Sequence, residues 1–265
     1  MYAFDYQKVK SVADAAAALG KNPEAKLLAG GQTLIASMKL RLANPGQVVD
    51  LGDVPELKGI KASGSAVTIG AMTRHAEVAS SAEVKKAIPA LAALASGIGD
   101  RMVRNMGTIG GSVANNDPAA DYPAALVALG ATVHTNKRKI AAEDFFKGMF
   151  ETALQAGEII TAVEFPVAKR AAYIKFKNPA SRYAIVGVFV ADTGSGVRVA
   201  VTGAGPKVFR VPEMEKALGS KFAADSVANI KIPDKGLNSD IHASAEYRAH
   251  LVTVMAKRAV AAALG

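Results

Sequence analysis

The chain contains no cysteine and no tryptophan among its 265 residues. Without cysteine it can form no disulfide, thiolate zinc site or catalytic thiol, and any iron–sulfur cluster would have to reside on a partner. The most apolar runs, such as IPALAALASGIG at residues 88–99, are shorter than the roughly 18 residues that a membrane-spanning helix needs. The N-terminal MYAFDYQKVK has an acidic residue and no apolar core, unlike a signal peptide. We therefore expect a cytoplasmic protein without a membrane span.

Aromatic residues are also scarce, at 6% of the chain. The formal net charge of +9 would suit nucleic-acid binding, but few side chains are available to stack on bases. The basic residues are scattered, and their densest cluster is only Lys137-Arg138-Lys139. The charge is better explained by a solvated basic surface, or by one that meets an acidic partner.

An apolar content of 50% supports one large domain or two ordinary ones. Ser11 and Asp14 predict a helix that begins at residue 12 and that Gly20 stops. Strands and helices then alternate irregularly up to Pro166. Beyond it, three strand-like runs, AYIKFKN, YAIVGVFVAD and VRVAVTGAG, are separated by turns such as TGSG at residues 193–196. This change predicts an α+β protein with a domain boundary at about 167–171.

Two glycine pairs are the most informative local feature. In LLAGGQTLIASMKLRLANP, residues 27–45, an apolar strand runs into the first pair, and a helix with Leu34, Met38 and Leu42 on one face follows. The second pair lies in MGTIGGSVANNDPAAD, residues 106–121. Such a turn can aim backbone N–H groups and a helix N-terminus into one concavity, although glycine can also serve a tight turn alone. Two of them suggest a diphosphate held between two loops that are neither P-loops nor Rossmann fingerprints.

Polar residues after the second pair have simpler explanations. Asp117 is typical of a turn, and Asp121, just ahead of a predicted helix, is typical of a helix N-cap. A carboxylate bound to a ribose or ribityl hydroxyl is the functional alternative. Residue types alone favour the cap.

Several segments resemble the FAD-binding medium subunits of molybdenum hydroxylases, the family that contains the carbon monoxide dehydrogenase medium subunit and the xanthine dehydrogenase FAD-binding subunit. They are LLAGGQTLIASMKLRLANPGQVVDL, GAMTRHAEV, RNMGTIGGSVANNDPAADYPAAL, FKNPASRYAIVGV and SAEYRAHLVTVMAKRAV. The resemblance implies a PCMH-type (vanillyl-alcohol-oxidase-like) FAD-binding domain of two α+β subdomains over residues 1–168. A smaller domain of carbon monoxide dehydrogenase flavoprotein type, with a three-stranded antiparallel sheet and helices, would follow over residues 171–265.

The resemblance also implies non-covalent FAD, with its diphosphate between the two glycine turns and a cofactor hydroxyl on Asp121, against the cap interpretation. His75 belongs to a helix start rather than to a covalent flavin link. The flavin supplies the chemistry, so no catalytic acid, base or nucleophile and no metal ligand is expected. The residues implied to bind FAD are Leu27, Leu28, Ala29, Gly30, Gly31, Gln32, Thr33, Leu34, Ile98, Thr108, Ile109, Gly110, Gly111, Ser112, Asp121, Ile160, Lys177 and Tyr183.

By the same resemblance, the protein is an oxidoreductase subunit that takes electrons from a small 2Fe–2S subunit and passes them to an external acceptor. A large subunit would carry the molybdenum cofactor, and the complex would be a dimer of heterotrimers. A self-contained flavin-dependent reductase of similar fold is the alternative, although the sequence offers no convincing acid–base set for it. A nucleic-acid-binding protein would show steeply salt-dependent binding without flavin.

Overall fold

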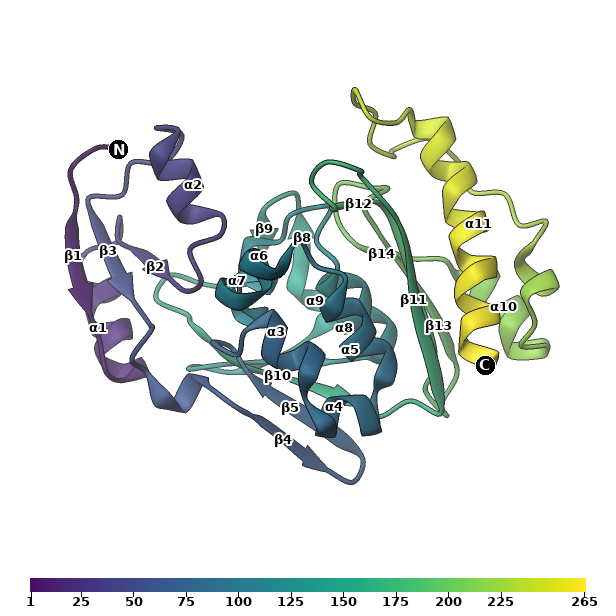
Figure 1. The fold of residues 1–265 in the computed structure, drawn as a ribbon, viewed down its shortest axis with the longest axis horizontal. Coiled ribbons are helices and arrows are strands. Elements are labelled where there is room, and N and C mark those ends of the chain that lie inside the picture. Colours follow the sequence, from purple (N-terminus) through teal and green to yellow (C-terminus); the bar gives the residue numbers. More distant parts are fainter.

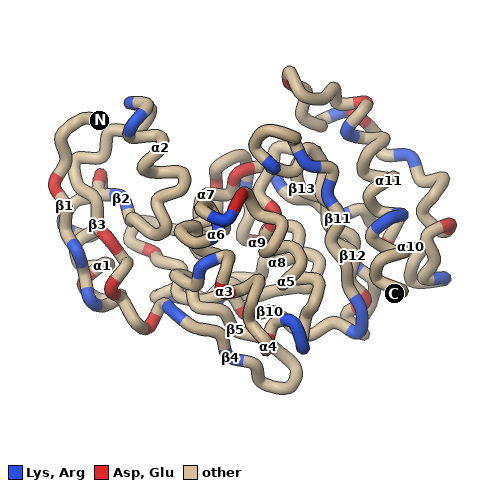
Figure 2. Tube along the Cα trace, in the orientation of Figure 1, with Lys and Arg blue, Asp and Glu red and all other residues tan.

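The computed structural model describes residues 1–265 and has three parts arranged side by side (Figure 1). A small N-terminal unit and a larger central unit lie next to each other, and a C-terminal sheet with helix α11 (Ala245–Leu264) flanks the central unit. Acidic and basic residues are interspersed along all three parts (Figure 2). No helix is long and apolar enough to cross a membrane.

The N-terminal unit is built on a three-stranded parallel sheet in the order β1-β3-β2. The Ser11 hydroxyl caps the first helix by accepting the Asp14 N–H at 3.0 Å, as the sequence predicts. Gly20 does not stop this helix, because its φ is not positive and the Asn22 N–H closes the last turn on the Ala18 carbonyl. The elements of this unit are β1 (Asp5–Lys8), α1 (Val12–Lys21), β2 (Lys26–Leu28), α2 (Leu34–Lys39), β3 (Gln47–Asp50) and η1 (Pro55–Leu57).

The central unit is a five-stranded antiparallel sheet, in the order β4-β5-β10-β6-β7, with a group of short helices. Every residue of helix α8 is buried, because it packs against β10 on one side and the C-terminal sheet on another. The strands are β4 (Ile60–Ser63), β5 (Ala66–Gly70), β6 (Thr132–Thr135), β7 (Lys139–Ala141), β8 (Phe146–Gly148), β9 (Glu151–Thr152) and β10 (Ile160–Pro166). The helices are α3 (His75–Ser80), α4 (Ala82–Ala87), α5 (Pro89–Ser96), α6 (Arg101–Met106), α7 (Ile109–Asn115), α8 (Tyr122–Leu129) and α9 (Ala142–Phe145).

The C-terminal sheet is antiparallel, as predicted, but it has four strands rather than three. The additional strand contains two residues paired with Ala200 and Val201, which is too short for an alternating pattern to mark it. The predicted turn at 193–196 is confirmed, since the Thr193 N–H bonds to the Gly196 carbonyl. The elements are β11 (Arg170–Lys177), β12 (Ala184–Asp192), β13 (Val197–Thr202), β14 (Phe209–Arg210), α10 (Pro212–Ser220), η2 (Ala224–Val227) and α11.

Strand β12 is buried on both faces. Phe189 and Ala191 join the core of the central unit, whereas Val186, Val188 and Val190 join a second core beneath α11. This division follows from the alternation of side chains along a strand. Two antiparallel sheets, a small parallel sheet and the helices packed with them confirm the predicted α+β class.

Candidate functional site

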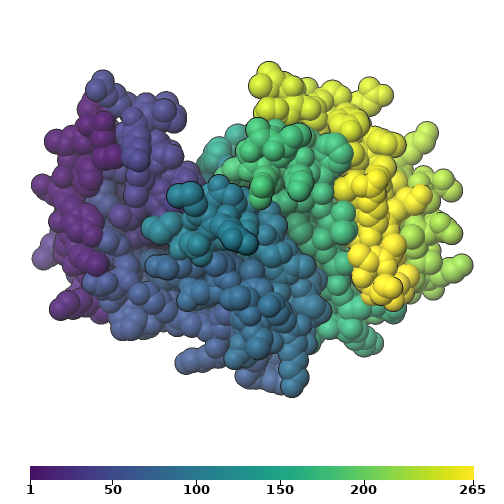
Figure 3. Space-filling model, viewed as in Figure 1, coloured from purple at the N-terminus to yellow at the C-terminus, as the bar shows by residue number.

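A cavity of about 680 Å³ lies where the N-terminal and central units meet. The segment after β2 lines it from the N-terminal unit, and the loops around α6, α7 and the β8–β9 hairpin line it from the central unit. The space-filling view shows a recess between the purple N-terminal unit and the teal and green parts (Figure 3). A pocket of this size is suited to a ligand larger than a single nucleotide base.

The first glycine pair supplies free backbone donors to this cavity. The consecutive N–H groups from Gly30 to Leu34 donate no hydrogen bond within the chain, and Gly31 has a φ of +71°. A Cβ at Gly30 would lie 2.0 Å from the Met106 carbonyl oxygen, so only glycine allows the two backbones to approach this closely. Unpaired N–H groups at a helix start form an anion site, as the sequence predicts for this loop.

The second glycine pair is not equivalent to the first. The Ile109 N–H bonds to the Thr73 carbonyl and the Gly110 N–H to the Ala71 carbonyl, at 3.0 and 2.8 Å. The Thr108 hydroxyl caps α7 by accepting the Gly111 N–H at 3.2 Å. The N–H groups at the start of α7 are therefore already bonded within the chain, so this turn does not offer free backbone donors as the first turn does.

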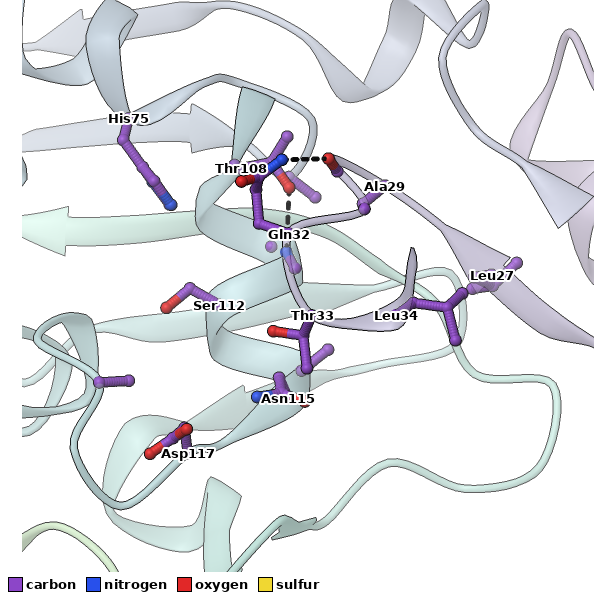
Figure 4. A pocket seen from close by; sticks show the side chains of 18 of the residues that line it. Leu27, Ala29, Gln32, Thr33, Leu34, His75, Thr108, Ser112, Asn115 and Asp117 are labelled. Carbon is purple, nitrogen blue, oxygen red and sulfur yellow. Dashed lines mark hydrogen bonds between the residues drawn. The ribbon is translucent and has the colours of Figure 1, made fainter. Parts of the chain in front are cut away.

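Close packing explains the first glycine of this pair. A Cβ at Gly110 would lie 2.5 Å from the Ala71 Cβ, whereas one at Gly111 would make an ordinary contact with the Ala29 Cβ, at 3.5 Å. Helix α7 thus lies directly against the end of β5 and the first glycine turn. Figure 4 shows Ser112 and Asn115 on this helix across from Thr33. The Ser112 hydroxyl makes no hydrogen bond within the chain and lines the cavity.

The structure brings most of the predicted site residues to the cavity wall, and three lie elsewhere. Leu28 is half-buried on β2, Ile109 is fully buried at the start of α7, and Lys177 is exposed at the end of β11. The residues that line the cavity are Leu27, Ala29, Gly30, Gly31, Gln32, Thr33, Leu34, Ile98, Thr108, Gly110, Gly111, Ser112, Asp121, Ile160 and Tyr183.

Asp121 occupies the N-cap position of α8, but its side chain makes no capping hydrogen bond. Its carboxylate instead accepts a hydrogen bond from the Tyr173 hydroxyl at 2.5 Å and pairs with the Lys175 ammonium at 3.0 Å. Burial raises the pKa of Asp121, and the Lys175 charge opposes that rise. The cap interpretation is therefore wrong. Asp117 does form the predicted turn, since it accepts the Ala119 N–H at 2.8 Å.

His75 begins α3, as predicted, but it also lines the cavity. Its side chain is buried and its Nδ1 has no hydrogen-bond partner. Burial, and secondarily the Arg104 charge, lowers the pKa of His75 to about 4, so the ring is neutral. The local sequence predicts the helix start. It does not predict the position of His75 at the cavity, which follows from a long-range β-bridge between Arg74 and Thr108.

Two further lining residues have no sequence signal. Phe150 at the tip of the β8–β9 hairpin and Arg182 after β11 have φ values of 56° and 62°, in the left-handed region. Asn116 anchors the hairpin, because its Nδ2 donates to the Gly148 and Glu151 carbonyls at 2.8 Å. Non-glycine residues rarely adopt this conformation, and when they do they often lie at functional sites.

No group of three or more histidine, aspartate or glutamate side chains in the chain could hold a metal ion.

Comparison with known proteins identifies the class of protein to which this cavity and this architecture belong. The family of the FAD binding domain in molybdopterin dehydrogenase matches residues 2–168. The family of the CO dehydrogenase flavoprotein C-terminal domain matches residues 171–263. The chain belongs to the FAD-binding medium subunits of these oxidoreductases, as the sequence resemblance predicts.

Particular relatives extend over almost the whole chain. The glyceraldehyde dehydrogenase medium chain of Sulfolobus acidocaldarius is 37% identical, over 97% of this chain and 96% of its own. The nicotine 6-hydroxylase medium subunit of Paenarthrobacter nicotinovorans is 38% identical over the same shares. A solved carbon monoxide dehydrogenase from Hydrogenophaga pseudoflava, which lacks the Mo-pyranopterin moiety, matches with a TM-score of 0.90 and 36% identity over 99% of this chain and 98% of that one.

The cavity fits the family's cofactor in its chemistry. The free N–H groups from Gly30 to Leu34 suit a diphosphate, and the close approach of Gly30 to Met106 leaves no room there for a side chain. The Ser112 hydroxyl lines the cavity without a hydrogen-bond partner in the chain and can bond to a hydroxyl or phosphate oxygen of a ligand. The residues present therefore fit FAD.

Proposed function

We propose that this chain is the FAD-binding electron-transfer subunit of a heterotrimeric molybdenum-containing hydroxylase or dehydrogenase. It would take electrons from a 2Fe–2S subunit and pass them to an external acceptor. The observation that carries the proposal is the run of unpaired N–H groups from Gly30 to Leu34, which lines a cavity in a chain of an FAD-binding family.

The first glycine turn would hold the FAD diphosphate, because it carries the free donors. Ser112 would add a hydroxyl from α7, and Asp121 would accept a hydrogen bond from a cofactor hydroxyl. Apolar walls at Leu27 and Ile98 would exclude water from the bound cofactor. Bound FAD can accept electrons singly and release them in pairs. Lys177 is exposed at the end of β11 and does not line the cavity, so its contact with the cofactor stays a prediction.

The other predicted residues that line the cavity would complete the binding site on both sides of the diphosphate. Non-covalent attachment is the expected mode, because His75 is buried against Gly107 and Tyr122, where a covalent bond to a flavin would require the ring to move. The N-terminal and central units together would form the FAD-binding domain at residues 1–168. The C-terminal sheet and its helices would form the domain at residues 171–265, and the short connection between β10 and β11 would join the two.

The proposed partner subunits would carry the redox groups that this chain has no ligands for. The chain has no cysteine to hold an iron–sulfur cluster, so the clusters would lie on a small partner, and a large partner would hold the molybdenum cofactor. Relatives of nearly equal identity, 37% and 38%, carry the names of glyceraldehyde and nicotine enzymes. The substrate would therefore be selected by the large subunit rather than by this chain. The full assembly would be a dimer of heterotrimers.

The visible spectrum of the purified chain, before and after incubation with FAD and gel filtration, tests the proposal. We expect about one equivalent of retained flavin, released by acid as intact FAD, and no turnover of an organic substrate by the chain alone. Turnover by the isolated chain would favour the self-contained reductase. A folded chain that binds no flavin, either alone or with co-expressed partners, would end the proposal.

A further inference from the structure

The side chain of Asp121 links the cavity wall to the C-terminal sheet. Asp121 precedes helix α8 of the central unit, whereas Tyr173 and Lys175 lie on β11. The Tyr173 hydroxyl donates to one carboxylate oxygen at 2.5 Å, and the Lys175 ammonium lies 3.0 and 3.1 Å from the two oxygens. The side chains of Asp121 and Lys175 are only 5% and 10% exposed, so water screens this pair little.

The carboxylate retains capacity for a ligand. An ionised carboxylate has about four acceptor positions, and the contacts with Tyr173 and Lys175 do not use all of them. Asp121 lines the cavity, whereas Tyr173 and Lys175 do not. Tyr173 and Lys175 therefore contact the carboxylate on the side that faces away from the cavity.

We infer that Tyr173 and Lys175 are positioning residues that keep the Asp121 carboxylate ionised and oriented toward a hydroxyl of FAD, so that the C-terminal sheet contributes to flavin affinity. The inference rests on the proposed function, because it assigns a role in binding the same cofactor. It extends the site to a strand whose residues make no contact with the cavity.

The electrostatics explain why the carboxylate needs this support. Burial favours the neutral acid, and a neutral acid is a poorer acceptor for a ligand hydroxyl. The groups that face Asp121 are Tyr122 on α8, Tyr173 and Lys175 on β11, and Tyr183 in the loop after β11. Lys175 is the only cation among them. Removing its charge would leave only the Tyr173 hydrogen bond to oppose burial and would raise the pKa of Asp121 further.

The test measures FAD affinity by flavin fluorescence between pH 5.5 and 8.5 for the full chain and four variants. K175M removes the cation, Y173F removes the hydroxyl donor, D121N removes the carboxylate, and K175M/D121N combines two changes. K169M is the matched control, because Lys169 is an exposed lysine just before the same strand.

We expect K175M to bind FAD about tenfold more weakly at pH 7, as for the loss of one charge-assisted contact. Its affinity should recover as the pH rises, because Asp121 then ionises, whereas the wild type and K169M should change little. The double variant should bind FAD no more weakly than D121N. Y173F should also lose FAD affinity in a way that recovers as the pH rises, but by a smaller factor than K175M.

Three results would overturn the inference while wild-type binding still supported the proposed function. They are unchanged affinity in K175M, a loss in K175M that is independent of pH, and losses that add in the double variant. If K175M does not fold, Y173F supplies the same comparison. Failure of the folded wild type to bind FAD would instead count against the proposed function itself.

Discussion

Replacing Gly30 with alanine is the most direct test of the site's geometry. Gly30 does not have a positive φ, so alanine can adopt its backbone conformation without strain. The new Cβ, however, would lie 2.0 Å from the Met106 carbonyl oxygen and 2.8 Å from the Gly107 Cα. Real Cβ atoms almost never approach within 3.0 Å, so the two segments must separate by about 1 Å. Both neighbours are backbone atoms, and no side chain can rotate away to relieve the contact.

We expect G30A to lower the free energy of unfolding by about 2 to 3 kcal/mol, the upper part of the range for overpacking. The separation would also move the free N–H groups away from α7. FAD binding should weaken by about a hundredfold, which corresponds to roughly 2.7 kcal/mol. Urea unfolding monitored by circular dichroism gives the first quantity, and flavin fluorescence titration gives the second.

Gly20→Ala is the matched control. Gly20 lies in α1, and a Cβ there would meet nothing within 4 Å. This change should stabilise the protein by about 0.5 to 1 kcal/mol, because alanine favours a helix, and it should leave FAD affinity unchanged. If G30A bound FAD as tightly as the wild type and unfolded at the same urea concentration, the packing argument would be refuted.

Three further predictions concern the cavity's surroundings. Arg138 lowers the pKa of Glu158 from 4.5 to about 2, so E158Q should cost about 2 to 3 kcal/mol at pH 7. That difference should shrink as the pH falls from 4.5 toward 2 in parallel urea titrations, and a constant difference would contradict the assignment. The imidazole of His75 should titrate near pH 4 by NMR rather than near 6.5. Its contribution to stability should be lost as the pH falls between these values, because the unfolded chain binds the proton first. N116A should destabilise the protein by about 2 kcal/mol and speed amide exchange in the β8–β9 hairpin. N116G should recover part of this loss, because glycine tolerates the left-handed backbone but cannot donate to the hairpin carbonyls.

Features fixed by neighbouring residues could be predicted from the sequence. The Ser11 cap and the turn at 193–196 each depend on a few adjacent side chains or on glycine. The apolar face assigned to the helix after residue 33 was less accurate. Met38 is buried, but Leu42 is 79% exposed, because α2 ends at Lys39 and Arg41 turns the chain with a φ of 60°.

The local geometry of the candidate site can be predicted from the sequence, whereas contacts with residues distant in the sequence cannot. The first glycine turn has the expected free donors within one continuous segment. The bonding of Ile109 and Gly110, by contrast, is set by the carbonyls of Thr73 and Ala71, far away in the sequence. The same holds for Asp121, whose partners on β11 come 52 and 54 residues later. Only the packing of the sheets identifies such contacts.

The position of strand β12 between two cores determines how the protein can unfold. One of its faces completes the core around α8 and the other completes the core beneath α11. A fragment that ended near residue 168 would expose the side of α8 that packs on β12 and β13, and the complementary fragment would expose Phe189. If either the central unit or the C-terminal sheet unfolded, the apolar surface that it covers on the other would be exposed to water. We therefore expect one calorimetric transition for the central unit and the C-terminal sheet, and little tolerance for exchanging either part for that of a distant homologue.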